Sequence, residues 1–357
     1  MSQIFTPVVP VAPSITNVIL AITGGIAAYK SALLARLLIK AGFEVRVIMT
    51  QGAQQFITPL TLQALTGNEV HTELLDTKAE AGMGHIELAK WADLIVIAPA
   101  SANTLARLAM GMADDLLATV CLATTAPVMV APAMNQQMWA HPAVQLNVQT
   151  LADMGYEMIE PDSGIQACGD TGAGRLPEPE ILLRRVINFK AKLMTPQYLA
   201  GKKVTITAGP TIESIDPVRF LSNHSTGTMG FALPRACRDA GAAVTLIAGG
   251  KVGLETPLDV QRVNVLSAND MMQAAERSAQ AGCDIFIASA AVADYRTRDA
   301  APQKIKKTQE QMTLELVKNP DILATISHNY PDMFMVGFAA ETQDVEKYAR
   351  GKLVSKN

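Results

Sequence analysis

Two series of short apolar runs, separated by segments of helical or polar character, constrain the fold of this chain most strongly. The runs of the first series cover 17–24, 44–50, 93–100 and 127–133. Those of the second series cover 204–211, 243–249, 284–292, 312–317 and 333–342. Strands that alternate with helices form parallel sheets, whose buried strands are apolar throughout. The sequence therefore predicts the α/β class, with two doubly wound, Rossmann-like domains and a single helix through residues 102–122 of the first.

A charged, proline-punctuated stretch at 177–200 separates the two series. We place the domain boundary near residue 190, which gives domains of residues 1–190 and 191–357. The length of 357 residues is enough for each domain to bury a core of its own. In such folds, ligands bind beyond the carboxyl ends of the strands. Two domains with a glycine-marked loop after the first strand of each predict two small-molecule sites.

Composition excludes several classes of function. A net charge of −3 gives no electrostatic reason to expect nucleic acid or an anionic membrane as partner. Four widely spaced cysteines favour neither a disulfide framework nor a zinc site. The N-terminal residues are apolar but broken by proline and lack a basic start, and no apolar run reaches bilayer length without charges or breakers. We expect a cytoplasmic protein without a membrane partner.

The loop after the first strand contains Gly24 and Gly25, directly before a helical segment. Backbone N–H groups at a helix N-terminus bind phosphate well, but a tight turn without a ligand explains two glycines equally well. The full G-x-G-x-x-G pattern is missing, which disfavours a nicotinamide dehydrogenase.

Three more segments of the first domain carry polar chemistry. His85 stands in GHIEL (84–88), where a surface or capping role is the common alternative, and Asn135 follows a buried strand, where it suits a helix N-cap. Cys168 lies in SGIQACGDTGAGR (163–175), whose four glycines suit a mobile flap better than a core. A lid that carries a proton donor is the interpretation we favour.

The second domain has a similar set of polar loops. Ser, Thr and Gly residues at 222–230 precede a helix and suit an anionic group or a simple cap. Asp294 ends a hydrophobic strand, and Lys304 begins a lysine run, which is either a solvated surface or a partner for phosphates.

Four motifs of the first domain, GGIAAYK (24–30), GHIEL, PAMNQQM (132–138) and SGIQACGDTGAGR, resemble the phosphopantothenoylcysteine decarboxylases. The resemblance implies a bound FMN, His85 as catalytic base, Asn135 as the residue that holds the substrate carboxylate, and Cys168 as proton donor in a flap. The implied flavin contacts are Gly24, Gly25, Thr50, Ser101, Asn103 and Thr104.

The second domain is similar to the phosphopantothenate–cysteine ligases from about residue 200 onward. That resemblance implies CTP, Mg²⁺ and an acyl-cytidylate intermediate, with Asn223 needed to turn it over. No residue is assigned to the metal. The implied nucleotide contacts are Asp294, Lys304, Asn319, Pro320, Asp321, Ile322, Phe338, Lys352 and Lys356.

Together the resemblances imply a bifunctional enzyme of coenzyme A biosynthesis that acts on 4′-phosphopantothenate, cysteine and CTP and forms homo-oligomers, as flavin-domain trimers or larger rings and ligase-domain dimers. The alternative is a decarboxylase with an inactive ligase domain, because relatives continue beyond Asn357 and usually carry Arg and Lys in place of Ile212 and Thr228. Other rivals are a flavoprotein that decarboxylates a different acid and a non-catalytic flavin-binding regulator.

Overall fold

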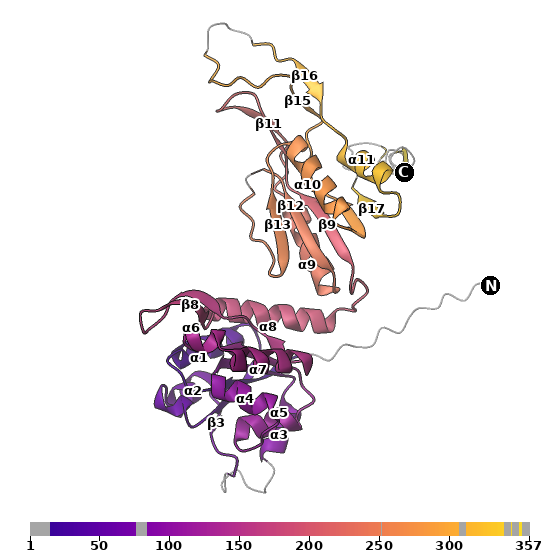
Figure 1. Ribbon diagram of the computed structural model, residues 1–357. Helices are drawn as coiled ribbons and strands as arrows, with labels where there is room; N and C mark the ends of the chain where they lie inside the picture. The colour runs from indigo at the N-terminus through magenta and orange to yellow at the C-terminus, as the bar shows by residue number, and fades with distance from the viewer. Residues whose placement is uncertain are drawn as a thin grey trace, which may run out of the picture. The chain divides into compact units, whose positions relative to one another are not determined.

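The computed structural model describes residues 15–75, 84–250, 252–306, 312–338, 344 and 350–351 (Figure 1). The chain divides into two compact units, Met1–Lys190 and Ala191–Asn357. Each unit contains a parallel sheet with helices on both faces, which confirms the predicted α/β class. None of the described helices is both long enough and apolar enough to span a bilayer.

The sheet of the first unit has the order β3-β2-β1-β4-β5-β6, and all of its pairings are parallel. Its strands are β1 (Asn17–Ile22), β2 (Glu44–Met49), β3 (Val70–His71), β4 (Leu94–Ala100), β5 (Val128–Pro132) and β6 (Glu157–Met158). The direction of strand succession reverses between β1 and β4. Ligands of open α/β sheets bind in the crevice at such a reversal, beyond the carboxyl ends of the strands.

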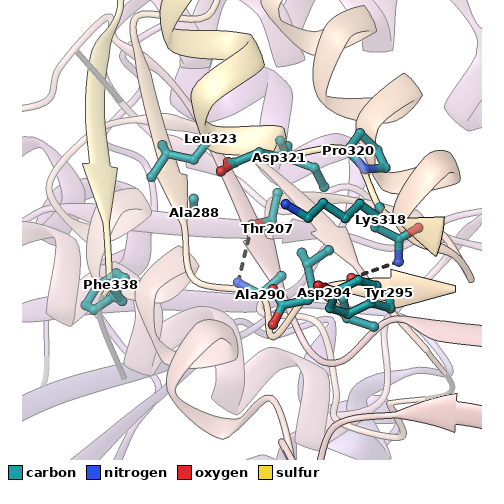
Figure 2. A pocket seen from close by; sticks show the side chains of 14 residues that line it. Thr207, Ala288, Ala290, Asp294, Tyr295, Lys318, Pro320, Asp321, Leu323 and Phe338 are labelled. Atoms are coloured by element: carbon teal, nitrogen blue, oxygen red, sulfur yellow. Dashed lines mark hydrogen bonds between the residues drawn. The ribbon is translucent and has the colours of Figure 1, made fainter. Parts of the chain in front are cut away.

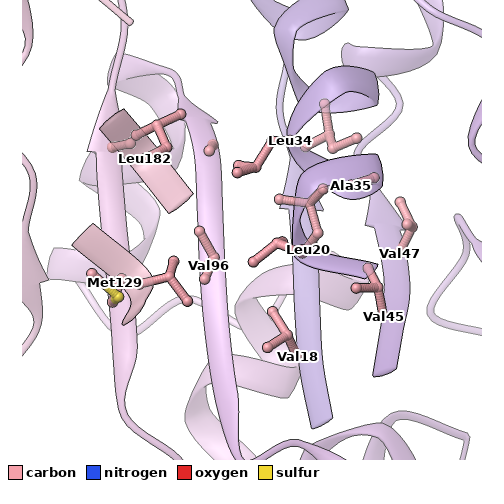
Figure 3. Close-up of a cluster of buried hydrophobic side chains, with 14 of the residues drawn as sticks. Val18, Leu20, Leu34, Ala35, Val45, Val47, Val96, Met129 and Leu182 are labelled. Atoms are coloured by element: carbon pink, nitrogen blue, oxygen red, sulfur yellow. The ribbon is translucent and has the colours of Figure 1, made fainter. Parts of the chain in front are cut away.

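Helices cover both faces of this sheet. One core contains side chains of α1 (Ala28–Lys40), α2 (Pro59–Thr66) and α8 (Pro179–Met194), and Figure 3 shows Leu20, Leu34 and Leu182 among its residues. The opposite core contains side chains of α3 (Gly84–Trp91), α4 (Ala102–Ala109), α5 (Leu116–Ala123) and α7 (Pro142–Asp153). Burial of apolar residues on both faces explains why the central strands β1, β4 and β5 are almost entirely apolar.

The predicted single helix through residues 102–122 is wrong, because two helices, α4 and α5, occupy this stretch. Gly111 has a φ of 66°, a left-handed conformation that ends the first helix. Asp115 then caps the second helix, since its Oδ1 accepts a hydrogen bond of 2.8 Å from the N–H of Ala118.

The sheet of the second unit has the order β13-β12-β9-β14-β17 and is also parallel. Its strands are β9 (Lys203–Ala208), β12 (Ala243–Ala248), β13 (Val260–Asn264), β14 (Ile285–Ala288) and β17 (Phe334–Gly337). Helix α9 (Thr228–Asp239) packs on one face, and α10 (Ala268–Gln280) and α11 (Ile322–Asn329) pack on the other.

The predicted strand at 312–317 is not part of this parallel sheet. Only β16 (Leu316–Lys318) forms there, and it pairs antiparallel with β15 (Tyr295–Thr297). Polar residues alternate with apolar ones in this run, a pattern typical of a hairpin with one solvated face. The sheet instead contains β13, a strand that the apolar runs do not predict.

Two further antiparallel hairpins project from the units. In the first unit, β7 (Asp162–Ile165) pairs with β8 (Thr171–Arg175), so the glycine-rich flap is a two-stranded hairpin. In the second unit, β10 (Ile212–Ser214) pairs with β11 (Phe220–Ser222). The shorter helices are η1 (Ala53–Gln55) and α6 (Gln136–Ala140).

Candidate functional sites

A buried threonine joins the two strands that flank the reversal in the first sheet. The Oγ1 of Thr23 donates to the carbonyl of Pro99 at 2.8 Å and accepts from the N–H of Ser101 at 2.8 Å. The Oγ of Ser31, in α1, donates to the carbonyl of Ala98 at 2.7 Å. These bonds fix the loop after β1 against the loop after β4, the place where a ligand of this fold is expected.

The glycine loop after β1 lies against the loop after β2. A Cβ at Gly24 would lie 3.1 Å from the carbonyl carbon of Gly52, whereas a Cβ at Gly25 would meet open space. Thr50 is held beside them, because its N–H donates to the carbonyl of Ile22 at 3.0 Å. The predicted residues Gly24, Gly25 and Thr50 thus lie at one edge of the sheet, where bare backbone and the start of α1 fit a phosphate group.

The predicted segment 101–104 begins α4. Ser101 is its N-cap, because its Oγ accepts from the N–H of Thr104 at 3.3 Å. The hydroxyl of Thr104 lies 3.1 Å from the Ser101 Oγ and is buried, while Asn103 is exposed. The Thr104 hydroxyl therefore stabilises the start of the helix, and Asn103 is the side chain of this segment that solvent reaches.

A cavity of about 380 Å³ opens beside Thr50. Its lining includes Asp114 and Asp115, two residues that sequence reasoning missed, and both carboxylates form ion pairs with Arg107, at 3.3 Å and 2.6 Å. The missed signal was a helix cap, an aspartate directly before an apolar run. The volume is within the range typical of small-molecule pockets.

The flap hairpin packs closely on the segment that follows β5. Gly174 has a φ of 133°, and a Cβ at this position would collide with the carbonyl oxygen of Met134. The N–H of Met134 donates to the carbonyl of Gly174 at 2.9 Å. Only glycine allows this approach, so Gly174 serves the packing of the flap.

Asn135 and Cys168 meet where the flap contacts the start of α6. The Oδ1 of Asn135 accepts from the N–H of Gln137 at 2.8 Å, so Asn135 is a helix N-cap, as the alternative interpretation proposed. Its Nδ2 lies 3.5 Å from the Sγ of Cys168 and 3.0 Å from Oδ2 of Asp170. One amide thus caps a helix with its oxygen and faces the flap with its nitrogen.

Gln166 anchors the flap to the same segment, and sequence reasoning missed it. Its Oε1 accepts from the N–H of Gln136 at 3.0 Å, and its Nε2 donates to the carbonyl of Met134 at 3.2 Å. No sequence pattern marks this glutamine, because its partners follow a strand about thirty residues earlier.

The two cysteines of the first unit differ in environment. Cys121 is buried, and desolvation, together with the charge of Asp115, raises the pKa of its thiol to about 12. Such a thiol is inert at neutral pH. Cys168 is exposed on the flap, where a ligand can reach it.

His85 lies in the first turn of α3 and is half-buried. No hydrogen bond among the described residues joins His85 to Asn135 or Cys168. Within the described part of the chain, a hydrogen bond joins two of the three predicted decarboxylase residues, Asn135 and Cys168.

The second unit contains a cavity of about 610 Å³ at the carboxyl ends of β9 and β14 (Figure 2). Its lining includes six predicted nucleotide contacts: Asp294, Asn319, Pro320, Asp321, Ile322 and Phe338. These residues come from three separate stretches of sequence. The volume suits a nucleotide-sized ligand.

Two of these six side chains hold the cavity in shape. The Nδ2 of Asn319 donates to the carbonyl of Ala293 at 2.7 Å, and its Oδ1 accepts from Arg296 at 3.2 Å. Asp321 caps α11, since its Oδ1 accepts from the N–H of Ala324 at 3.0 Å. Lys318 also lines the cavity and is a cation that the predicted set lacks.

Asn223 lies next to this cavity. Its Nδ2 donates to the carbonyl of Ala291 at 3.0 Å, and the neighbours of Ala291 on both sides, Ala290 and Val292, are lining residues. The structure thus places the predicted Asn223 near the predicted nucleotide contacts.

The described lining of the cavity does not include Lys304. Its neighbour Ile305 is held by the buried carboxylate of Asp216 and by Arg219, whose side chain is partly exposed. Asp216 accepts from the N–H of Ile305 at 3.1 Å and pairs with Arg219, whose Nη2 donates to the carbonyl of Ile305 at 3.0 Å. The Arg219 guanidinium and three backbone N–H groups keep the pKa of Asp216 well below its usual range. Lys352 and Lys356 lie outside the described residues, and those described contain no group of three acidic, histidine or cysteine side chains that could hold a metal ion.

Separate family models match the first and the second part of the chain. Residues 11–190 match the family model described as Flavoprotein, and residues 199–357 match the one described as DNA/pantothenate metabolism flavoprotein C-terminal domain. The chain is 55% identical over 342 residues to the coenzyme A biosynthesis bifunctional protein CoaBC of Haemophilus influenzae, covering 96% of this chain and 84% of that protein. It is 51% identical over 347 residues to the CoaBC protein of Escherichia coli K12, again covering 96% of this chain and 84% of the relative.

Two solved structures each match part of this chain. The C-terminal domain of a CoaBC protein is 43% identical, with a TM-score of 0.40, and the match covers 44% of this chain and 74% of that one. The FMN binding protein AtHal3 is 35% identical, with a TM-score of 0.44, and the match covers 49% of this chain and 97% of that one.

Proposed function

The chain belongs to the family of bifunctional coenzyme A biosynthesis proteins, and we propose on this premise that residues 191–357 join cysteine to 4′-phosphopantothenate and residues 1–190 decarboxylate the product. It is an enzyme with decarboxylase and ligase activities. Because its relatives match through both units, the alternative of a decarboxylase with an inactive ligase domain is not favoured.

The first unit is a flavoprotein domain, and we propose FMN as its cofactor. The edge formed by Gly24, Gly25 and Thr50 fits a phosphate, and Thr50 also lines the cavity of about 380 Å³. When bound, FMN would supply a two-electron acceptor for the cysteinyl CH₂–SH group, which gives the loss of CO₂ an electron sink, and would return the two electrons afterwards, so that no net oxidation results.

The side chains of the first unit bind the substrate and move protons. Asn135 donates its Nδ2–H to the substrate carboxylate, and Cys168, on the flap above it, delivers a proton to the carbon that has lost CO₂. His85 is proposed as the base that takes the thiol proton. The flap excludes water during these steps. The meeting of Asn135 and Cys168 at 3.5 Å is the observation that supports this half most directly.

In the second unit we propose that CTP activates the carboxylate of 4′-phosphopantothenate. A carboxylate resists attack by an amine until one of its oxygens becomes part of a leaving group. Here the carboxylate attacks the α-phosphate of CTP and releases pyrophosphate, and the amine of cysteine then attacks the acyl-cytidylate and displaces CMP. Asn223 is proposed to hold the acyl-cytidylate, while Asp294 and Phe338 contact the nucleotide in the cavity that they line. Lys304, Lys352 and Lys356, with Mg²⁺, are proposed to neutralise the phosphates.

The test is to incubate the purified protein with 4′-phosphopantothenate, cysteine, CTP and Mg²⁺ and to analyse the products by mass spectrometry. We expect 4′-phosphopantetheine and CMP, with little product when ATP replaces CTP. A parallel sample receives ready-made phosphopantothenoylcysteine, which separates the two steps. Failure of that sample to release CO₂ contradicts the decarboxylase half, and failure of the first sample alone contradicts the ligase half.

Two remaining expectations belong to this proposal. We propose a cytoplasmic homo-oligomer, because the small-molecule substrates named above are those of a metabolic enzyme and the relatives are of the same bifunctional type. Light scattering of the purified protein measures the oligomeric state, and a monomer under assay conditions would contradict this part.

A further inference from the structure

Asp170, on the flap, has no role in the function proposed above, yet it contacts both residues at the centre of the first site. Its Oδ2 lies 3.0 Å from the Nδ2 of Asn135, which donates to it, and 3.5 Å from the Sγ of Cys168. One carboxylate oxygen therefore accepts an amide N–H and a thiol S–H together.

The Oδ1 of Asn135 accepts the N–H of Gln137 and so caps α6. Only Nδ2 faces the flap, where Asp170 is its closest partner and Gln166 lies at 3.4 Å. A hydrogen bond from an amide to a carboxylate is charge-assisted and stronger than one to a neutral group. Asp170 therefore binds the Nδ2 of Asn135, the same group that is proposed to bind the substrate carboxylate.

We propose that Asp170 is a positioning residue whose carboxylate occupies the Asn135 amide, and holds the Cys168 thiol beside it, until the carboxylate of the substrate takes its place. This inference rests on the proposed function. Two carboxylates beside one amide nitrogen repel each other, so the arriving substrate displaces Asp170. The exchange frees the S–H group of Cys168 at the moment when a substrate is present to receive its proton.

The flap can stay closed while Asp170 leaves, because other bonds attach it. Gln166 bonds to Met134 and Gln136, and the N–H of Met134 donates to the carbonyl of Gly174 at 2.9 Å. None of these bonds involves the Asp170 side chain. Substrate binding therefore has to break only the contacts of one exposed carboxylate.

The experiment measures ligand affinity of the FMN-bound protein by the change in its flavin absorbance. One ligand is the amide of 4′-phosphopantothenate with serine, which has the carboxylate but no thiol to oxidise. Its partner is the amide with ethanolamine, which lacks the carboxylate. The proteins are wild type, Asp170→Ala, Asp170→Asn and the control Asp162→Ala, which removes another exposed carboxylate of the same hairpin.

We expect Asp170→Ala to bind the serine amide roughly fivefold more tightly than wild type, the gain expected if the competing contact occupies most wild-type molecules. Affinity for the ethanolamine amide should not change, and Asp162→Ala should match wild type with both ligands. Asp170→Asn keeps the shape but not the charge and should fall between wild type and Asp170→Ala.

A purely structural role for Asp170 predicts an equal loss of affinity for both ligands, and that result would overturn the inference. Unchanged affinity for the serine amide in both Asp170 variants would overturn it as well. In either case a wild type that binds the serine amide leaves the proposed function standing. A wild type that binds neither ligand contradicts the proposed function and this inference with it.

Discussion

Replacement of Thr23 by valine tests whether the hydroxyl that joins β1 to β4 stabilises the first unit. Valine has nearly the same shape as threonine, so the change leaves no cavity and removes only the hydroxyl. Thr23 is fully buried, and its Oγ1 makes the two 2.8 Å bonds to Pro99 and Ser101 described above.

The expected loss of stability depends on whether the carbonyl of Pro99 and the N–H of Ser101 keep another hydrogen-bond partner. The carbonyl of Pro99 keeps a second donor, the N–H of Thr23 at 3.2 Å, whereas the N–H of Ser101 loses its acceptor. A lost hydrogen bond plus an unsatisfied donor costs about 2–4 kcal/mol. In a unit of this size that corresponds to a fall in Tm of about 5–12 °C.

Flavin release on heating, followed by fluorescence, reports on the first unit without a contribution from the second. Thr23→Ser is the matched control, because it keeps the hydroxyl and loses a methyl group, and its Tm should lie closer to wild type than that of Thr23→Val. A Tm for Thr23→Val that matches wild type would refute the assignment of stability to this hydroxyl.

Three further predictions address the flap and the second unit. Gly174→Ala should reduce the rate of decarboxylation roughly a hundredfold, because the added Cβ collides with the Met134 carbonyl and displaces the flap. The rate of ligation by the same sample is the control. An equal loss of both activities would contradict a cause in the flap. Asn319→Ala should raise KM for CTP roughly tenfold, because Ala293 and Arg296 lose their hydrogen bonds to the Asn319 side chain. An unchanged KM would exclude a role of Asn319 in shaping the cavity. Because the pKa of Asp216 is lowered, its ionised form stabilises the folded second unit above about pH 4, and this contribution is lost as the pH falls towards the lower folded-state pKa. The difference in unfolding free energy between wild type and Asp216→Asn, measured by urea titration, should therefore shrink below pH 4. A difference that stays constant with pH would contradict this role of Asp216.

The strand ends that carry the two sites follow from sequence alone, because the apolar runs define where each parallel strand stops. Gly24, Thr50 and Asn135 are predictable in this way, since strands of one sheet end at one edge. The proposed role of Asn223 comes from the resemblance to known enzymes, because spacing alone does not give it.

The partners of these residues were not predictable. Asp170 reaches Asn135, and Gln166 reaches Gln136, because a hairpin folds back over a helix start thirty or more residues earlier. The bond between Asp216 and the N–H of Ile305 spans 89 positions of sequence. Contacts of this kind depend on how loops pack, and residue patterns within one loop do not encode them.

Cys168→Ser, assayed with phosphopantothenoylcysteine, tests the central claim that the flap thiol gives the last proton of the decarboxylation. The account predicts that CO₂ is released and that a product lighter than 4′-phosphopantetheine by two hydrogen atoms accumulates, as mass spectrometry can detect. Formation of 4′-phosphopantetheine by Cys168→Ser at the wild-type rate would contradict the account.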